Sequence, residues 1–423
     1  MKISKVQNGI NGEISDIASD KSISHRAAIF SLLSDKESHL RNFLLAEDTL
    51  NSLKIVEILG AKVKKENGEI FINPPKKIIE PSEILNCGNS GTAMRILCGF
   101  LASKNGFFVL NGDKYLNNRP MGRVLEPLKK AGALFDAREK NFAPLCIRGK
   151  KLDFFKFESK ISSAQIKTAM ILAGLNSNGC EFIEPSLSRN HTEIMLKFMG
   201  AEISSQNLKT IVKPIKSPLK PLDIKIPNDP SSAFFFAVAA LILPNSKIIL
   251  KDILLNKTRI EAFKILQKMG GKIEFLNVKN GFETTGDILV QSSNLNAICV
   301  DTNISWMIDE APALGIAFAC ANGKSVLKNA KELRVKESDR IKTMVLGLKN
   351  CGIDAIELED GFEITGKKAN FAKIDSFGDH RIAMSFAILG LKCGMKIENS
   401  EFISTSFPNF TKILQNLGVK IEN

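Results

Sequence analysis

Apolar residues along the chain form two kinds of helical segment, and each kind occurs six times. The first kind is an amphipathic stretch that ends in a glycine and runs into an alternating, strand-like stretch. Successive glycines are separated by 72, 68, 70, 82 and 66 residues. A glycine just past a helix adopts the left-handed conformation that ends it. The pattern predicts six outer helices, each followed by strand, polar turn and strand. The glycines are Gly60, Gly132, Gly200, Gly270, Gly352 and Gly418.

The second kind of segment starts with polar or small residues and continues as an almost wholly apolar helix. A helix that is apolar all round is buried. These segments alternate with the first kind, so one repeat reads strand, buried helix, strand, outer helix, strand, strand. Their sequences are DKSISHRAAIFSLL, GNSGTAMRILCGFL, SSAQIKTAMILAGL, NDPSSAFFFAVAALIL, IDEAPALGIAFACA and GDHRIAMSFAILGL.

This pattern predicts an α/β protein of two domains, because 423 residues exceed what one core supports. Three repeats per domain fit the usual domain size. The proline-rich segment 213–230 is the best crossing point, and a compensating crossing near residue 15 places the strand at 2–6 with the C-terminal repeats. We expect one domain of residues 16–227 and one of residues 1–15 plus 228–423, with the active site in the interdomain cleft. If the buried helices of each domain run parallel, their positive ends face that cleft and favour anions.

The net charge of +13 raises nucleic acid as a partner. The lysines are spread over the whole chain, however, and one Trp and one Tyr provide few stacking residues. Arginine is scarce, with 12 Arg against 46 Lys, and six of the 12 fall in the motifs described below. Because arginine binds carboxylate and phosphate in a bidentate way, this distribution favours small acidic substrates over a polyanion. A non-catalytic basic binding protein, for example for RNA, remains the alternative; it predicts a continuous basic stripe with aromatic residues.

Eight cysteines are scattered, without a C-x-x-C pair or a Cys/His cluster at metal spacing. We therefore expect reduced, buried thiols, a cytoplasmic location and no metal. The N-terminus MKISKVQNG lacks the apolar run of a signal peptide. The longest apolar run, 233–243, is too short for a bilayer, so no membrane association is expected.

The most charged motif is RVKESDR, residues 334–340, with three cations and two acids. Ser338 is expected to cap a helix that begins at Asp339-Arg340. Lys336 and Arg340 then lie near a helix N-terminus, which favours an anion, and Glu337 is a carboxylate among cations. That combination suits a site that binds an acidic substrate and moves a proton. The alternative interpretation is a solvated helix start with surface ion pairs.

The first two buried helices also start with anion-binding residue types. At the first, Lys21, Ser22 and Arg26 could face an anion together, whereas His25 is not expected to be a general base, because protonation beside Arg26 is unfavourable. At the second, Gly91 lets a ligand approach the backbone N–H groups. Capped helices with surface charges are the alternative for both.

Four further segments add candidates. Arg119 precedes a proline that could start a helix, and Ser163 with Gln165 offers hydroxyl and amide donors at another buried helix. Asp309 heads a buried helix and could accept a proton from a substrate hydroxyl. Arg381 starts the last buried helix as a further anion ligand, with Asp379 as its cap. Each could be simple capping; their shared position in successive repeats indicates a common site.

Six motifs closely resemble the EPSP synthase (3-phosphoshikimate 1-carboxyvinyltransferase) family of enolpyruvyl transferases, over about residues 21–408. The resemblance implies two domains, each of three βαβαββ units, in an inside-out α/β barrel. It implies transfer of the enolpyruvyl group of phosphoenolpyruvate to the 5-hydroxyl of shikimate 3-phosphate, with release of phosphate, in the shikimate pathway to chorismate and aromatic amino acids. We expect a cytoplasmic monomer without a cofactor. The motifs are RVKESDR, GDHRIAMSF, KSISHR, GNSGTAMR, NRPMG and SAQIKTA.

The resemblance also implies roles for single residues. Asp309 would be the base on the 5-hydroxyl, Glu337 would protonate the enolpyruvyl methylene, and Lys21 would assist catalysis. The shikimate 3-phosphate ligands would be Lys21, Ser22, Arg26, Ser163, Gln165, Ser188, Asp309 and Lys336. The phosphoenolpyruvate ligands would be Lys21, Gly91, Arg119, Gln165, Arg340 and Arg381.

The sequence departs from the enteric branch of the family at two places. Thr405-Ser406 precede Phe407-Pro408 where that branch has a lysine, and Glu332 replaces an asparagine. Gly91 matches the glyphosate-sensitive form of its motif, which predicts inhibition by glyphosate. The sister enolpyruvyl transferase, which acts on a UDP-sugar, shares the six-unit architecture but resembles neither RVKESDR nor KSISHR.

Overall fold

The computed structural model describes residues 1–422 and is an α/β structure. The chain divides into two compact units. Unit 1 comprises Met1–Asp20 with Pro227–Asn423, and unit 2 comprises Lys21–Ile226. The chain therefore changes unit after residues 20 and 226, compared with the crossings near residues 15 and 227 expected from the sequence.

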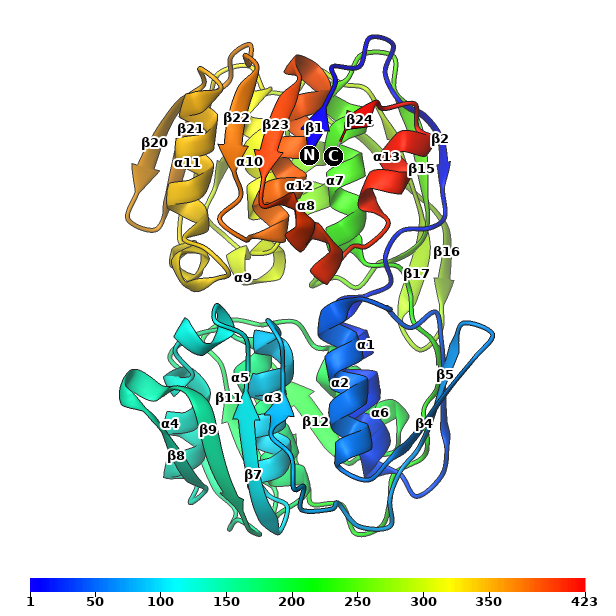
Figure 1. Cartoon of the computed structure of the whole chain (residues 1–423), viewed down its shortest axis with the longest axis vertical. Helices are drawn as coiled ribbons and strands as arrows, with labels where there is room; N and C mark the ends of the chain where they lie inside the picture. The colour runs from blue at the N-terminus through cyan, green and yellow to red at the C-terminus, as the bar shows by residue number, and fades with distance from the viewer. Residues whose placement is uncertain (423) are drawn as a thin grey trace. The chain divides into compact units, whose positions relative to one another are not determined.

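The described residues form six four-stranded sheets with one shared topology (Figure 1). Each sheet contains one parallel and two antiparallel strand pairs, as in β6-β7-β9-β8, where β6 and β7 are parallel and β9 is antiparallel to β7 and β8. Unit 2 contains β14 (Asp223–Lys225), β3 (Ser38–Arg41), β5 (Glu69–Asn73) and β4 (Lys62–Glu66); β6 (Leu85–Asn86), β7 (Gly106–Asn111), β9 (Phe142–Gly149) and β8 (Leu134–Arg138); and β10 (Phe155–Glu158), β11 (Cys180–Ile183), β13 (Lys209–Val212) and β12 (Ile203–Gln206).

The sheets of unit 1 recruit strands from the start of the chain. The strand expected at 2–6 is the shorter β1, which lies between β23 and β24, and β2 pairs in parallel with β15 (Figure 1). The unit contains β22 (Ala372–Asp375), β23 (Met395–Glu398), β1 (Lys2–Ile3) and β24 (Ile421–Glu422); β16 (Lys272–Asn280), β17 (Thr284–Gln291), β15 (Lys247–Leu254) and β2 (Asn11–Ile14); and β18 (Cys299–Val300), β19 (Lys324–Leu327), β21 (Gly361–Thr365) and β20 (Asp354–Leu358).

The core of unit 2 is built on three nearly apolar helices: α1 (Lys21–Phe30), α3 (Gly91–Ala102) and α5 (Ala164–Leu175). Helices α3 and α5 approach closely because Gly99 has no side chain. A Cβ atom there would overlap the Ala169 carbonyl group. The predicted burial of these helices is confirmed. The outer helices are α2 (Glu47–Ile58), α4 (Gly122–Lys130) and α6 (His191–Phe198), and the short 3-10 turns are η1 (Ser31–Leu33), η2 (Leu116–Asn118) and η3 (Glu139–Asn141).

Unit 1 has the same arrangement around α7 (Pro230–Ile242), α10 (Ala311–Ala319) and α12 (His380–Cys393), which are buried as predicted. The Phe236 ring contacts Phe407 and Phe410, with ring centroids 5.9 and 5.6 Å apart. These rings join α7 to the C-terminal segment. The remaining elements are α8 (Glu261–Lys268), α9 (Ile304–Met307), α11 (Arg340–Asn350), α13 (Phe410–Asn416), η4 (Lys331–Val335) and η5 (Ser400–Thr405).

The six repeat glycines all adopt positive φ, from 77° to 104°. Each follows the end of an outer helix, so the predicted left-handed helix ends are confirmed. Side chains with a Cβ atom rarely adopt this conformation, which explains why glycine recurs at these positions.

All eight cysteines are free thiols. The expected burial holds for four of them, whereas Cys146, Cys320 and Cys393 are partly exposed and Cys299 is exposed. Within residues 1–422, the helices fall short of the length and apolar character that a membrane crossing requires.

Candidate active site

In unit 1 the candidate residues gather around Arg340, the first residue of α11, whose side chain is 1% exposed. Its Nε donates to Asp379 Oδ2 at 2.8 Å, and its Nη2 donates to Glu337 Oε2 at 2.6 Å. Its Nη1 lies 3.6 Å from Asp309 Oδ1 and has no hydrogen-bond partner among residues 1–422. Burial alone would lower the pKa of Arg340, but Asp379 and Glu337 raise it overall, so the guanidinium stays charged.

The caps of two helices create this cluster. Asp339, not Ser338 as expected, caps α11 by accepting from the Lys342 N–H at 3.1 Å. The Ser338 hydroxyl instead donates to Asp379 Oδ2 at 3.1 Å, because the carboxylate of Asp339 reaches the first turn and leaves the hydroxyl available. Asp379 caps α12, as predicted, by accepting from the Arg381 N–H at 2.9 Å. Burial raises the pKa of Asp379, but Arg340 more than offsets this, and the pKa is lowered overall.

The cations of the motif at 334–340 have different roles. Arg334 donates to Asp339 and Glu357 at 2.9 and 2.7 Å and to two backbone carbonyl groups, so it fixes the backbone of its own surroundings. Lys336 lies 3.9 Å from Glu332. Burial lowers the pKa of Lys336, and Glu332 and other nearby carboxylates only partly oppose this effect.

Asp309 lies in the turn between α9 and α10, since the helix that it was expected to head begins only at Ala311. Pro312 in the first turn explains the later start, because proline fits the first helical positions. The Asp309 backbone carbonyl accepts from Arg381 Nη1 at 3.0 Å, and its carboxylate is 3.9 Å from Arg381 Nε. Asp309, Lys336, Glu337, Arg340 and Arg381 thus form one cluster in unit 1.

Beside this cluster lies a buried network that the sequence motifs did not indicate. Arg259 is 1% exposed and donates to Asp20, to Asp229 Oδ1 at 2.8 Å and to Ser231 Oγ at 3.0 Å. The Ser231 hydroxyl donates to Glu310, the neighbour of Asp309. Within unit 1, Arg259 therefore ties the end of the N-terminal segment to the segment that follows the second chain crossing. Its partner Asp20 is 239 residues away, so no local pattern could have revealed it.

In unit 2, Lys21 starts α1 and forms an ion pair with Asp48 in the first turn of α2. Asp48 is 5% exposed and Lys21 18% exposed in their side chains. The carboxylate holds the ammonium group in place. Asp48 was not among the predicted residues; the one available signal was a pair of acids at the start of an amphipathic helix.

Gly91, the first residue of α3, lies between two guanidinium groups. A Cβ atom at this position would come within 2.9 Å of Arg95 Nη1 and 3.1 Å of Arg119 Nη2. Gln165 of α5 accepts from Arg95 Nη1 at 2.7 Å and donates to Thr92 Oγ1 at 2.9 Å. Arg119, expected just before a helix, is instead buried and precedes α4 by a turn of two residues, because the helix begins at Gly122. Gly91, Arg119 and Gln165 are thereby brought together with Arg95.

Arg26 is 3% exposed and binds within unit 2. It donates to Thr192 Oγ1 and Thr168 Oγ1, both at 2.8 Å, and to the Ser22 carbonyl at 3.0 Å. It therefore joins α1, α5 and α6. His25 is fully buried, as suits a structural histidine.

Two serines complete the unit 2 candidates. Ser163 is the residue before α5 and is 8% exposed. Ser188 lies in the loop between β11 and α6, is 2% exposed, and its Oγ has no hydrogen-bond partner among residues 1–422. Ser163 is thus the cap residue of α5, whereas Ser188 lies three residues before α6 begins.

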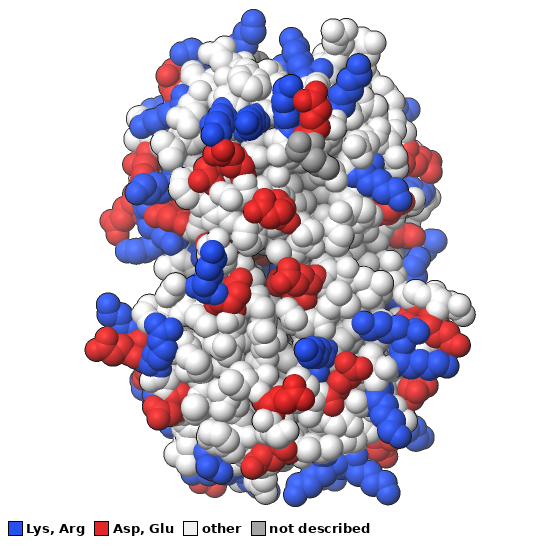
Figure 2. All heavy atoms as spheres, in the orientation of Figure 1, with Lys and Arg blue, Asp and Glu red and all other residues white. Residues whose placement is uncertain are grey.

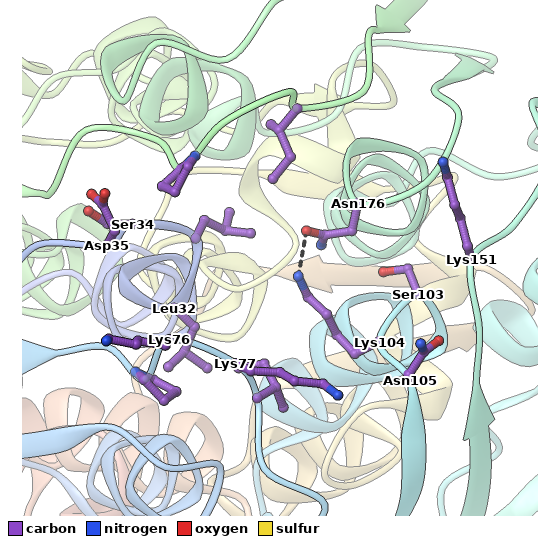
Figure 3. A pocket seen from close by; sticks show the side chains of 15 residues that line it. Leu32, Ser34, Asp35, Lys76, Lys77, Ser103, Lys104, Asn105, Lys151 and Asn176 are labelled. Atoms are coloured by element: carbon purple, nitrogen blue, oxygen red, sulfur yellow. Dashed lines mark hydrogen bonds between the residues drawn. The ribbon is translucent and has the colours of Figure 1, made fainter.

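A hollow of 420 Å³ lies at the other ends of α1, α3 and α5 (Figure 3). Lys104 donates there to Asn176 Oδ1 at 2.8 Å, and burial lowers the pKa of Lys104 to about 8. The other lysines of this hollow, Lys76, Lys77 and Lys151, extend in different directions (Figure 3). Cations at helix C-termini balance the helix dipoles, so these lysines have a structural explanation. The hollow contains none of the predicted site residues.

The surface charges bear on the nucleic-acid alternative. On the face shown in Figure 2, basic and acidic side chains are interspersed. This face therefore lacks the continuous basic stripe that a nucleic-acid-binding protein would show. Among the described residues, no group of three or more His, Cys, Asp and Glu side chains is placed to hold a metal.

The family model described as EPSP synthase (3-phosphoshikimate 1-carboxyvinyltransferase) matches residues 5–414. Curated proteins named 3-phosphoshikimate 1-carboxyvinyltransferase from Campylobacter concisus and Campylobacter jejuni are 64% and 60% identical, and each alignment covers 100% of this chain and at least 99% of the relative. The solved structure of EPSP synthase from Acinetobacter baumannii superimposes with a TM-score of 0.87 at 35% identity, covering 100% of this chain and 99% of that one.

Proposed function

Because the chain belongs to the EPSP synthase (3-phosphoshikimate 1-carboxyvinyltransferase) family, we propose that it transfers the enolpyruvyl group of phosphoenolpyruvate to the 5-hydroxyl of shikimate 3-phosphate and releases phosphate. The product, 5-enolpyruvylshikimate 3-phosphate, leads to chorismate and the aromatic amino acids. Both substrates carry phosphate and carboxylate groups. These groups suit the arginines and lysines of the unit 1 cluster and those near the starts of α1 and α3 in unit 2.

One observation carries the proposal to the residue level. Each unit contains a buried donor without a hydrogen-bond partner among residues 1–422, namely Arg340 Nη1 in unit 1 and Ser188 Oγ in unit 2. Leaving such a group unsatisfied costs about 1–3 kcal/mol. Both belong to residues expected to bind substrate, so an anionic ligand would satisfy them.

The phosphoenolpyruvate ligands are proposed from the charges of both clusters. Arg340 and Arg381 offer guanidinium groups next to Asp309 in unit 1. In unit 2 the absence of a Cβ atom at Gly91 lets the Arg119 guanidinium group lie close to the start of α3. The full set is Lys21, Gly91, Arg119, Gln165, Arg340 and Arg381.

The shikimate 3-phosphate ligands are proposed mainly from unit 2. Ser188 supplies the unsatisfied hydroxyl, Ser163 stands at a helix start, and Arg26 is fixed between two threonines. Helix starts favour phosphate through their free N–H groups. The full set is Lys21, Ser22, Arg26, Ser163, Gln165, Ser188, Asp309 and Lys336.

The proposed chemistry needs one base and one acid. Asp309 takes the proton of the 5-hydroxyl, with Lys21 as the second candidate, while Glu337 gives a proton to the methylene carbon of phosphoenolpyruvate. The hydroxyl oxygen bonds to C2, which yields a tetrahedral intermediate. Loss of phosphate and of a proton from the new methyl group completes the transfer. Arg340 binds Glu337 and lies beside Asp309, so one guanidinium organises both carboxylates.

The finer features of the fold and the protein's setting belong to the same proposal. Each unit would be an inside-out α/β barrel of three βαβαββ units. We further expect inhibition by glyphosate, a cytoplasmic monomer and no need for a cofactor. Gly91, whose missing Cβ atom lets two guanidinium groups approach the start of α3, supports the inhibitor expectation.

The test is phosphate release from the purified protein with phosphoenolpyruvate plus shikimate 3-phosphate, against each substrate alone. Release that requires both substrates would support the transferase. Glu337→Gln should reduce kcat by about 100-fold or more, in the range typical of a general acid, while calorimetry still detects shikimate 3-phosphate binding. Folded protein that binds neither substrate and releases no phosphate would overturn the proposal and favour a binding protein.

A further inference from the structure

Lys167 is a buried lysine of α5 that the proposed reaction does not use. Its side chain is 1% exposed. Its Nζ lies 2.8 Å from Glu184 Oε1 and 2.8 Å from Glu193 Oε1, and it donates to the Ser188 carbonyl oxygen at 3.4 Å. A lysine ammonium has three N–H donors, so these three acceptors use all of them.

The three acceptors belong to a continuous stretch of chain. Glu184 follows β11, Ser188 lies in the loop, and Glu193 is in the first turn of α6. Lys167 therefore holds both ends and the middle of the loop 184–193 against α5. A further contact fixes the loop near its start, where the Ser186 N–H donates to Ser162 Oγ at 3.0 Å.

The same part of α5 contains a proposed substrate ligand, Gln165, and a partner of another, Arg26. Gln165 precedes Lys167 by two residues, and Thr168 follows it directly. Thr168 Oγ1 is 2.6 Å from Thr192 Oγ1, and both threonines accept from Arg26. Lys167 and Arg26 thus both connect α5 to the first turn of α6, which follows the loop that contains Ser188.

We propose that Lys167 is a positioning residue that holds the Ser188 loop in the geometry that binds the ring and phosphate of shikimate 3-phosphate. This inference rests on the proposed function. Stability alone does not account for the cluster, because replacing a buried ion pair by apolar side chains of similar volume is often neutral or stabilising. A geometric role does account for it: the unsatisfied Ser188 Oγ belongs to the residue whose carbonyl Lys167 binds.

The experiment compares two variants with wild type by calorimetry of shikimate 3-phosphate alone and by steady-state kinetics. Lys167→Met removes the ammonium but leaves two buried carboxylates, which could prevent folding. The triple variant Lys167→Met/Glu184→Gln/Glu193→Gln removes those charges as well. In the folded variant, Kd and KM for shikimate 3-phosphate should rise about tenfold, as for loss of one well-placed hydrogen bond, whereas KM for phosphoenolpyruvate stays within about twofold.

A double-mutant cycle shows whether Lys167 acts through Ser188. Ser188→Ala should itself raise the Kd for shikimate 3-phosphate about tenfold, and the triple variant should add less than about twofold in that background. Effects that multiply, or a folded triple variant with unchanged Kd, would overturn the inference. Wild-type protein that does not bind shikimate 3-phosphate would overturn the proposed function first, before any variant is made.

Lys104→Met is the matched control. Lys104 donates to Asn176, the residue that follows α5, at the opposite end of the helix from the proposed ligands. If the loss of any lysine contact at α5 weakened shikimate 3-phosphate binding by lowering the stability of the protein, Lys104→Met would weaken binding too. We expect its Kd for that substrate to remain within about twofold of wild type.

Discussion

At the scale of single residues, partners rather than residue type decide the roles. Arg334 and Arg340 stand six positions apart in one charged motif. Arg334 uses its donors on backbone carbonyls and on carboxylates of its own surroundings, whereas Arg340 is buried and organises Glu337 and Asp379. A motif therefore indicates a site without saying which of its cations serves it.

Gly91 gives a prediction at this scale. Gly91→Ala places a Cβ atom within 2.9 and 3.1 Å of the Arg95 and Arg119 guanidinium groups, which must shift. KM for phosphoenolpyruvate should rise about tenfold, because a displaced anion ligand loses a charged hydrogen bond, while Kd for shikimate 3-phosphate changes little. Gly281→Ala is the control, since that glycine has space for a Cβ atom. Unchanged kinetics in Gly91→Ala would contradict the prediction.

Lys336 gives a prediction of pH dependence. Because burial lowers the pKa of Lys336 from 10.5, its amine loses the proton at a lower pH than an ordinary lysine. As the pH rises, binding of anionic substrates should therefore begin to weaken before pH 10.5 is reached, because Lys336 loses its positive charge. Lys336→Arg keeps its charge and should lack this alkaline limb in a pH profile of kcat/KM. The same limb in both proteins would exclude Lys336 as its cause.

At the scale of elements, two helix caps also bind the arginines of the charged motif. Asp339 caps α11 and pairs with Arg334, and Asp379 caps α12 and pairs with Arg340. Capping is visible in the sequence, because it depends on neighbouring residues. The second role of each aspartate is to bind an arginine. Packing brings Arg340 to Asp379, and the segment before α11 brings Arg334 to Asp339.

Asp379→Asn separates these two roles. Asparagine caps helices as well as aspartate does, so α12 should keep its start. The buried Arg340 loses a carboxylate partner, and unfolding in urea should show a destabilisation of about 3–5 kcal/mol, with a rise in KM for phosphoenolpyruvate. Asp339→Asn is the comparison: its ion pair to Arg334 is partly exposed and should contribute less than about 1 kcal/mol. Equal destabilisation by the two substitutions would show that the burial of Arg340 does not determine the loss of stability.

At the scale of the whole molecule, the two units differ in continuity. Unit 2 is one stretch, Lys21–Ile226, whereas unit 1 needs the first 20 residues of the chain as well as the C-terminal half. Strand β1 lies inside a sheet between β23 and β24, and β2 completes the sheet of β15. The chain must therefore bring its start back to the C-terminal half before unit 1 can form all its sheets.

Fragments test this difference. A fragment of residues 21–226 should unfold cooperatively on its own, because its three sheets and buried helices are complete. A fragment of residues 227–422 should not, since loss of β1 separates β24 from β23; joining residues 1–20 to it through a flexible linker should restore cooperative unfolding. Circular dichroism during thermal unfolding measures both. Independent folding of residues 227–422 would show that the N-terminal strands are dispensable.

The sequence by itself determined the repeats, the helix ends and the family. The left-handed glycines and the apolar helices follow from residues close together in the chain, so their pattern is readable directly. The helix starts near Asp309 and Asp339 were predicted only to within a few residues, because several side chains compete to cap a helix.

Only the tertiary structure decided which charges meet. Arg259 binds Asp20, which is 239 residues away in the chain, and Lys167 binds the loop that contains Ser188. Asp48, which holds Lys21, was also revealed only by packing. The physical reason is that a buried charge requires an opposite charge in contact, and contact depends on how distant segments pack rather than on local pattern.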